Sequence, residues 1–585
     1  MNDRETRKFV RPSILKSALA TLLLAGLSHG PAALADDDGG GLRPGNLLVS
    51  RVVYDNNPAN VVAGVTVLPP NCVGAACAKA TDNGAYPNVW NNALVDPSFG
   101  VTSKIILDQL TRFGVLISSL EVPNSSQRHV SPSSDQMVGS FSSKSEVALN
   151  LSTDKRFVTF LGYLAPLNAL DASNDNTPFV IDPTNPVSGL AYRVAAQVDG
   201  QGKFHFTKTN AYSGNNGRAV VLNNNNGASL LYTAGNAGNG GNPQPNGVIV
   251  GAGAQILTAA TTALSAQPDP GMPTPVGSFS ISQLGLKADK VGKDTNFRGL
   301  TLFNNVVYYT KGSGSNGVNT VYFIDTTGFD SAGRPLACPN GTGLPGPSAS
   351  LPVAPIVYDA SQLQTKGVFP YNMCVLKGFT TALAKNTTDS FPFGVWFANA
   401  TTLYVADEGD GTNTFNPATG TYAAAAAQTA AGLQKWVFDA GLGAWKRVYV
   451  LTAGLDLGVP YTVDRYPGGN NPATGLPWSP ATDGLRNLTG RVNRDGSVTI
   501  WAITSTVSGN GDQGADPNKL VMIRDTLAAT SLPPTESFKT IRVARFGEVL
   551  RGVSFTPGTG VPPHHDDDDE DGHDGGHDDH DHDGR

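Results

Sequence analysis

The sequence predicts an all-β protein built from many short hairpins. Glycine and proline are abundant, with 67 and 40 copies among 585 residues, whereas charged residues make up only 15%. This composition disfavours long helices and favours turns. Asn-Gly pairs, which accept the positive φ angles of tight hairpins, recur, for example at 216–217, 226–227, 316–317 and 510–511. One hairpin phrase also recurs along the chain with different letters, and this repeat determines the predicted architecture.

The first 35 residues are expected to be a signal peptide and not part of the fold. Basic residues precede an apolar run, ALATLLLAGL, which is too short to span a bilayer comfortably. Ala33-Leu34-Ala35 supplies the small residues of a cleavage site before Asp36. An uncleaved membrane anchor is the alternative. We therefore expect an exported protein, periplasmic or extracellular, with no membrane span.

After a Gly/Asp-rich linker at 36–45, the chain from 46 to 557 reads as a series of strands. NLLVSRVVY opens it, a turn-rich insertion follows at about 56–100, and two strands then flank Arg112-Phe113-Gly114. The hairpin phrase is an apolar strand, a polar turn and a strand of β-branched and aromatic residues. It occurs at 146–163, 218–236, 297–315, 393–409 and 488–505.

Further strands follow most copies of the hairpin phrase. Third strands are expected at 189–198, 319–326, 432–439 and 518–525, and fourth strands at 203–209, 445–451 and 538–546. Four antiparallel strands per repeat, joined head to tail, are typical of a β-propeller blade. A β-sandwich, or two all-β domains, is the alternative.

The two ends of this region are predicted to share one blade. VLRGVSFTP at 549–557 matches the first strand of the phrase but has no second strand after it, and NLLVSRVV lacks a first strand. Pairing them closes the ring and removes open sheet edges. Five internal units and this closing one predict six blades. Seven is the alternative, with the extra blade within 56–100 or 240–290.

The four cysteines are predicted to form two disulfides, as expected in an oxidising compartment. The simplest of three connectivities joins Cys72 with Cys77 and Cys338 with Cys374. A zinc site is the rival interpretation, but neither spacing is typical of one and no histidine lies near either pair.

Residues 558–585 are predicted to form a disordered His/Asp-rich tail, because from His564 onward they include no apolar residue to offset the entropy of ordering. This stretch holds six of the nine histidines, and eleven carboxylates against one arginine. Mixed imidazoles and carboxylates are ligands for Zn²⁺, Ni²⁺ or Cu²⁺. The candidate metal ligands are His564, His565, His573, His577, His580, His582, Asp578 and Asp581. A solvated acidic tail that keeps the protein soluble is the alternative.

The net charge of −7 comes from this tail, and the rest of the mature chain is near neutral. A neutral body without a basic stripe argues against nucleic acid as a partner.

The loop after the 393–409 hairpin is the best predicted ligand site in the body of the protein. Asp407, Glu408 and Asp410 in ADEGDG are candidate ligands for Ca²⁺, since propellers commonly build sites from such loops. The spacing fits no EF-hand loop, and ordinary turn chemistry is the alternative.

Arginines recur near the first strands of the repeat and are expected to line the channel. They are Arg218, Arg298, Arg491 and Arg551. Two interpretations are open: they hold an anionic ligand, or they form hydrogen bonds between blades.

Several stretches together resemble a group of exported bacterial β-propeller proteins. They are LYVADEGDG, GLQKWVFD, GLRNLTGRVNRDGSVTIWAITS and GDQGADPNKLVMI, and the resemblance extends over most of residues 45–557. It implies a propeller fold and export, but the group has no assigned activity and supplies no catalytic residue. The chain resembles NHL/YVTN-like and phytase-like propellers in architecture only. The phytases bind Ca²⁺ through acidic channel loops. The acidic loops of this chain resemble those loops in composition but do not share a sequence motif with them.

These observations favour a monomeric, exported scaffold that binds an unknown ligand at a propeller face and sequesters divalent metal with its tail. Two alternatives stay open: a Ca²⁺-dependent hydrolase or lyase acting on a phosphoester or polysaccharide, and a periplasmic metal-handling protein. The sequence contains no G-x-S-x-G, zincin or Gly-rich phosphate motif. It therefore assigns no catalytic residue and leaves enzymatic activity open.

Overall fold

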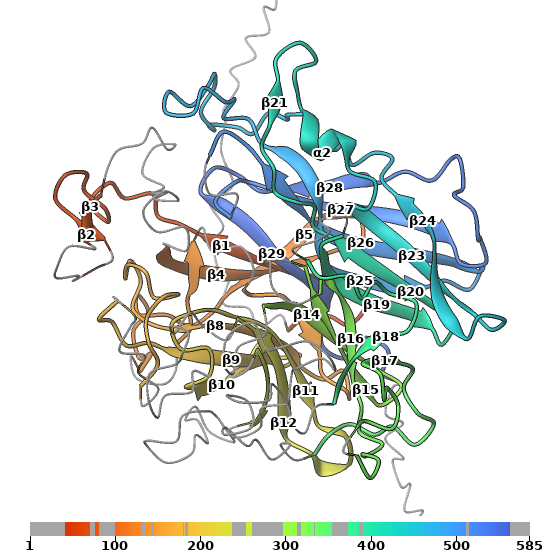
Figure 1. The fold of residues 1–585 in the computed structure, drawn as a ribbon. Helices are drawn as coiled ribbons and strands as arrows, with labels where there is room; N and C mark the ends of the chain where they lie inside the picture. Colours follow the sequence, from red (N-terminus) through yellow and green to blue (C-terminus); the bar gives the residue numbers. More distant parts are fainter. Residues whose placement is uncertain are drawn as a thin grey trace, which may run out of the picture. The chain divides into compact units, whose positions relative to one another are not determined.

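The protein is a six-bladed β-propeller, as the sequence predicts. Six small antiparallel sheets follow one another around a ring (Figure 1). The computed structural model describes residues 41–68, 70, 77–80, 100–131, 136–141, 146–178, 181, 185, 187–236, 253–259, 296–312, 318–332, 334–353, 372–384, 390–510 and 514–561.

In every blade the strands lie in order from the ring centre outward. Blade 1 consists of β29 (Glu548–Phe555), β1 (Leu47–Val53), β4 (Val101–Leu110) and β5 (Leu116–Glu121), with β6 (Gly139–Phe141) beside β4. Blade 2 consists of β7 (Asn150–Leu151), β8 (Val158–Leu164), β9 (Tyr192–Val198) and β10 (Phe204–Thr209). Blade 3 consists of β11 (Gly217–Asn223), β12 (Leu230–Gly235) and β13 (Ala254–Thr258).

The other three blades follow the same order. Blade 4 consists of β14 (Phe297–Phe303), β15 (Val306–Lys311), β16 (Thr320–Ile324), β18 (Met373–Leu376) and β17 (Thr342–Gly343). Blade 5 consists of β19 (Pro392–Asn399), β20 (Thr402–Asp407), β23 (Gly432–Asp439) and β24 (Ala444–Leu451). Blade 6 consists of β25 (Ala481–Val492), β26 (Ser497–Val507), β27 (Lys519–Thr526) and β28 (Lys539–Val543).

Little regular structure lies outside the blades in the part of the chain that the structure describes. It comprises two small sheets, β2 (Val67–Leu68) with β3 (Ala78–Lys79) and β21 (Phe415–Asn416) with β22 (Thr421–Tyr422), a 3₁₀ turn (Asn225–Gly227) and the short helix α2 (Ala423–Ala427). Within these same residues we find no helix with the length and apolar character needed to cross a bilayer.

The two ends of the described chain close the ring. β29 pairs antiparallel with β1, from Leu47 opposite Phe555 to Val53 opposite Glu548. The pairing confirms the predicted shared blade, and it covers the edge of β1 that would otherwise be open.

Turn chemistry forms the predicted hairpins. Asn304 and Asn305, between β14 and β15, both have positive φ angles, 46° and 59°. Two consecutive positive φ values define the type I′ turn whose twist matches that of paired strands. This turn lets β14 pair directly with β15 and places β14 innermost in blade 4.

The fourth strand of blade 4 is a strand that the repeat pattern does not reveal. β18 pairs with β16, although it lies at the end of the long insertion at 327–375 and is only four residues long. Cys374 in β18 forms a disulfide with Cys338, with Cα atoms 5.9 Å apart. This confirms one predicted pairing; Cys72, of the predicted Cys72–Cys77 pair, lies outside the described residues.

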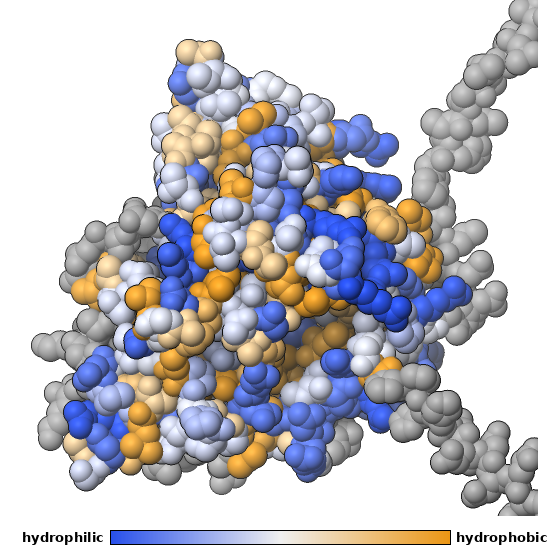
Figure 2. Space-filling model, turned by 90° about the vertical axis from the view of Figure 1, so that its right-hand side faces the viewer, coloured by the Kyte–Doolittle hydropathy of each residue, from blue (hydrophilic) through white to orange (hydrophobic). Residues whose placement is uncertain are grey.

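The core consists of apolar layers between neighbouring blades. Phe303 of blade 4 stacks on Phe397 of blade 5 with ring centroids 4.5 Å apart, and Trp501 of blade 6 meets the edge of Phe555 of blade 1 at 5.4 Å. On the outer face shown in Figure 2, hydrophobic and hydrophilic residues are interspersed, as on an ordinary solvated surface. The layers hold the blades together and position the inner strands around a common centre.

Candidate functional site

A cavity of about 910 Å³ lies at the centre of the ring. All six innermost strands contribute to its wall; one lining residue from each is Asn150, Ala219, Leu300, Val395, Leu488 and Phe555. A cavity of this size suits a small organic ligand. Because its wall comes from six different blades, the cavity exists only in the closed ring.

The cavity wall is mostly neutral, and its charged residues are positive. Among the described residues that line it, Lys155 and Arg491 carry charge and none is Asp or Glu. Both cations are exposed and lie near the turns that lead from inner strands into second strands. This end also carries amide side chains, including Asn225, Asn304 and Asn305.

Equivalent residues of the innermost segment of each blade lie beside the other end of the cavity. We call them the axial ring: Glu146, Arg218, Arg298, Phe393, Arg486 and Arg551. All six are buried, and the four arginines have exposed fractions of 4–8%. Phe393 also lines the cavity, as do neighbours of the arginines such as Ala219, Gly299 and Asn487. The axial ring and the cavity are therefore continuous.

A β-bulge lies at the axial position in five of the six blades. The pairing register shifts between Gly217 and Ala219, between Phe297 and Gly299, and between Pro392 and Gly394. Shifts of the same kind occur around Arg486 in β25 and opposite Arg551 in β29. A bulge re-aims one side chain relative to the regular alternation of a strand. The repeated bulge accounts for the common placement of the axial side chains.

Small residues follow the bulges because the inner strands touch backbone to backbone there. A methyl group at Gly394 would lie 2.6 Å from the carbonyl oxygen of Arg486 in the next blade. One at Gly299 would collide with the carbonyl of Phe393, and one at Gly552 would lie 2.7 Å from the carbonyl of Val147. Such distances are too short for a Cβ atom, so any larger residue would push the blades apart.

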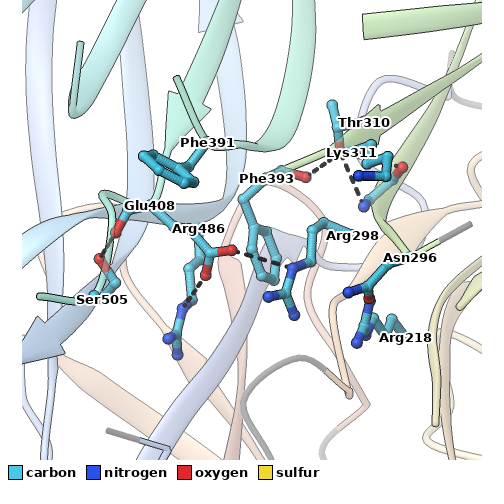
Figure 3. A network of polar contacts seen from close by, with 12 residues as sticks. Arg218, Asn296, Arg298, Thr310, Lys311, Phe391, Phe393, Glu408, Arg486 and Ser505 are labelled. Atoms are coloured by element: carbon cyan, nitrogen blue, oxygen red, sulfur yellow. Dashed lines mark hydrogen bonds and ion pairs between the residues drawn. The ribbon is translucent and has the colours of Figure 1, made fainter. Parts of the chain in front are cut away.

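Glu408 joins two of the axial arginines. Its two carboxylate oxygens lie 3.1 Å from Nε of Arg298 and 3.2 Å from Nε of Arg486 (Figure 3). The aromatic ring of Phe393 lies between the same two guanidinium groups, with its centroid 6.0 Å and 5.9 Å from their Cζ atoms. A carboxylate and an aromatic face both stabilise cations. Arg298 and Arg486 therefore share one carboxylate and one aromatic face.

Arg218 has a different environment. Its Nη1 donates hydrogen bonds to Oδ1 of Asn296 and, at 3.0 Å, to the carbonyl oxygen of Phe297 in the next blade. Both acceptors are neutral. Burial and the nearby Arg298 guanidinium hold the pKa of Arg218 well below its usual range, against the attraction of Glu408 and Glu146. For the Arg218 cation, the cost of burial and of the nearby positive charge therefore exceeds the stabilisation by nearby carboxylates.

The three predicted loop ligands, Asp407, Glu408 and Asp410, point in different directions. Asp407 is buried inside blade 5, where it accepts hydrogen bonds from Ser390, from Gln434 and from the backbone N–H groups of residues 391 and 409. Burial raises its pKa to about 7, although these donors act the other way. Glu408 forms ion pairs with two axial arginines, and the Asp410 side chain is exposed.

Among the described residues, no three or more His, Cys, Asp and Glu side chains are grouped so as to hold a metal ion. The three loop side chains do not converge on one point in this structure, and the Ca²⁺ assignment stays a prediction. The predicted tail ligands, from His564 to His582, lie outside the described residues.

The sequence pattern located some of the axial residues but not all of them. It picked out Arg218, Arg298 and Arg551, but in blade 6 it picked out Arg491, which lies near the opposite end of the cavity. The equivalent residue is Arg486. A usable signal exists, since Arg298-Gly-Leu-Thr and Arg486-Asn-Leu-Thr share the pattern R-x-L-T.

A scan against protein-family models finds no match, and a search of curated proteins finds no relative. The resemblance to exported bacterial propellers is thus supported at the level of the fold, and function has to be argued from the site.

Proposed function

We propose that this protein is an exported β-propeller whose function is to bind a small ligand in the central cavity. One observation carries the proposal: a cavity of about 910 Å³ walled by the inner strands of all six blades. Export is supported by the Cys338–Cys374 disulfide, because such bonds persist mainly in oxidising compartments.

Binding is favoured over hydrolysis by the environment of the acidic loop. Asp407 accepts four hydrogen bonds within its blade, and Glu408 is engaged by two arginines. A Ca²⁺-dependent hydrolase would need these carboxylates to turn toward a shared ion. The contacts instead hold Asp407 within blade 5 and hold Glu408 against Arg298 and Arg486.

Filling the cavity is expected to abolish ligand binding while preserving the fold. Thr301 on β14 and Thr489 on β25 line the cavity and are partly exposed to it, so Thr301→Trp and Thr489→Trp would occupy ligand space. Thermal unfolding is measured with neutral sugars, sugar acids, amino acids and nucleotides. A ligand at 100 times its Kd stabilises the native protein by about 2.7 kcal/mol. That stabilisation is expected in the wild type and not in the filled variants.

Thr540→Trp, at an exposed position of outer strand β28, is the matched control and should respond like the wild type. If no class of ligand stabilises the wild type, or if the filled variants respond equally, the cavity is not the binding site.

We also propose that the His/Asp tail sequesters divalent metal. The support is the alternation of six histidines with carboxylates in residues 564–585. Calorimetric titration with Zn²⁺ is expected to give several bound ions for the full chain and almost none for a chain truncated after Val561. Unchanged stoichiometry after truncation would exclude the tail. A parallel titration with Ca²⁺ tests the loop, since tight Ca²⁺ binding that survives truncation would favour the hydrolase alternative.

A further inference from the structure

The axial ring carries more positive than negative charge. Four of its members are arginines and one is a glutamate, and Glu408 adds a second carboxylate. Among these named side chains, four cations face two anions. Buried charges in proteins are normally paired, because an unpaired one pays the full cost of desolvation.

The arginines of the axial ring differ in how they are compensated. Glu408 and Phe393 engage Arg298 and Arg486. Arg218 forms no ion pair among the described residues, and its Nε has no hydrogen-bond partner there. Figure 3 shows Arg218 next to Arg298 in the row that continues through Phe393 to Arg486. A guanidinium group whose Nε has no described partner, next to the cavity-lining residue Ala219, is suited to binding an acidic group.

The rest of the cavity favours the same ligand charge. Lys155 and Arg491 are the charged residues among its described lining, and no described lining residue is acidic. A cleft lined by one sign of charge raises the local concentration of the opposite ion. Between Lys155 and Arg491 near one end of the cavity and Phe393 near the other, no described lining residue would repel an anion.

We propose that the axial ring binds an acidic group, a carboxylate or a phosphate, of the ligand that occupies the central cavity. This inference rests on the proposed function and specifies its ligand class as an organic anion. Arg218 supplies the principal contact. Arg298 and Arg486, held by Glu408, keep the neighbouring field positive without binding the anion themselves. The uncharged middle of the cavity, including Leu300, Val395 and Leu488, contacts the remainder of the ligand.

The experiment uses citrate and inorganic phosphate as separate probes, titrated at constant ionic strength so that non-specific screening does not change. At least one of them is expected to bind the wild type and to raise its Tm. Arg218→Met should weaken that binding at least tenfold, and Arg218→Lys should weaken it less. A response to citrate alone assigns a carboxylate ligand, and a response to phosphate alone assigns a phosphate.

Stability without the anion separates this role from a structural one. If Arg218 is a binding residue, Arg218→Met removes an uncompensated buried charge, and the Tm in anion-free buffer is unchanged or higher. If Arg218 serves only to join blades 3 and 4, the same variant has a lower Tm. Arg465→Met is the matched control, since the Arg465 side chain is 85% exposed, and it should leave both the binding and the Tm unchanged.

Three results would overturn the inference: no response of the wild type to either probe, equal binding by Arg218→Met, or a lower anion-free Tm in that variant. Thr301→Trp distinguishes this failure from failure of the proposed function. A neutral ligand that Thr301→Trp blocks would preserve the cavity function without the acidic group. If the anion binds Thr301→Trp as tightly as the wild type but does not bind Arg218→Met, the anion site exists but the cavity is not where the ligand binds.

Discussion

Replacing Lys435 with methionine is expected to lower the free energy of unfolding by about 3–5 kcal/mol, because it leaves a buried carboxylate without its counter-ion. Nζ of Lys435 lies 2.9 Å from Asp525, and neither side chain is exposed. The same nitrogen donates hydrogen bonds to the hydroxyl of Tyr449 at 2.9 Å and to the carbonyl of Thr526 at 2.8 Å. Tyr449 in turn donates to Asp525 at 2.7 Å. This network joins blade 5 to blade 6.

Urea unfolding of the wild type, of Lys435→Met and of Lys435→Met combined with Asp525→Leu measures the effect. The double variant should recover most of the lost stability, since it removes the unpaired charge together with its partner. Lys446→Met, on an exposed position of β24, is the matched control and should change stability little. A loss below about 1 kcal/mol for Lys435→Met, the range of exposed ion pairs, would show that this network does not hold the blades together.

Truncation after Arg545 is expected to abolish the native fold. It removes β29, which pairs with β1 along its whole length and is the innermost strand of blade 1. β1 would become an open edge, with buried residues such as Leu47 and Leu48 left without their neighbours. Near-UV circular dichroism and size-exclusion chromatography should report loss of tertiary structure and aggregation.

Truncation after Val561 keeps β29 and serves as the control. Its unfolding transition should coincide with that of the full chain. A monomeric, cooperatively folded protein ending at Arg545 would contradict the closure of the ring by both chain ends.

The hairpin repeat was sufficient to predict the blades because hairpins are local. The turn at Asn304-Asn305 and the paired strands β14 and β15 are specified within about fifteen residues. The alternation of apolar and polar residues in such strands is visible in the sequence. The closing blade was also predictable, because VLRGVSFTP resembles the other inner strands. β18 was missed since it is short and lies at the end of a long insertion.

The axial ring was only partly predictable, for two physical reasons. A β-bulge breaks the alternation of a strand by one residue, so alternation alone does not show which way Arg486 faces; only the R-x-L-T pattern shared with Arg298 marks its position. The partners of these arginines also come from other blades: Arg486 meets Glu408 across 78 residues of sequence. In the sequence, Glu408 resembles a calcium ligand of its own loop. In the folded ring it is the counter-ion of Arg298 and Arg486.

The central claim is that the cavity ends in a buried site for an acidic group, and a crystal structure with citrate at a saturating concentration tests it most directly. The predicted result is a citrate carboxylate inside the cavity, within about 2.7–2.9 Å of the Arg218 guanidinium group. Glu408 should still hold Arg298 and Arg486. Citrate bound only on the outer surface, or absent from the cavity at that concentration, would contradict the claim.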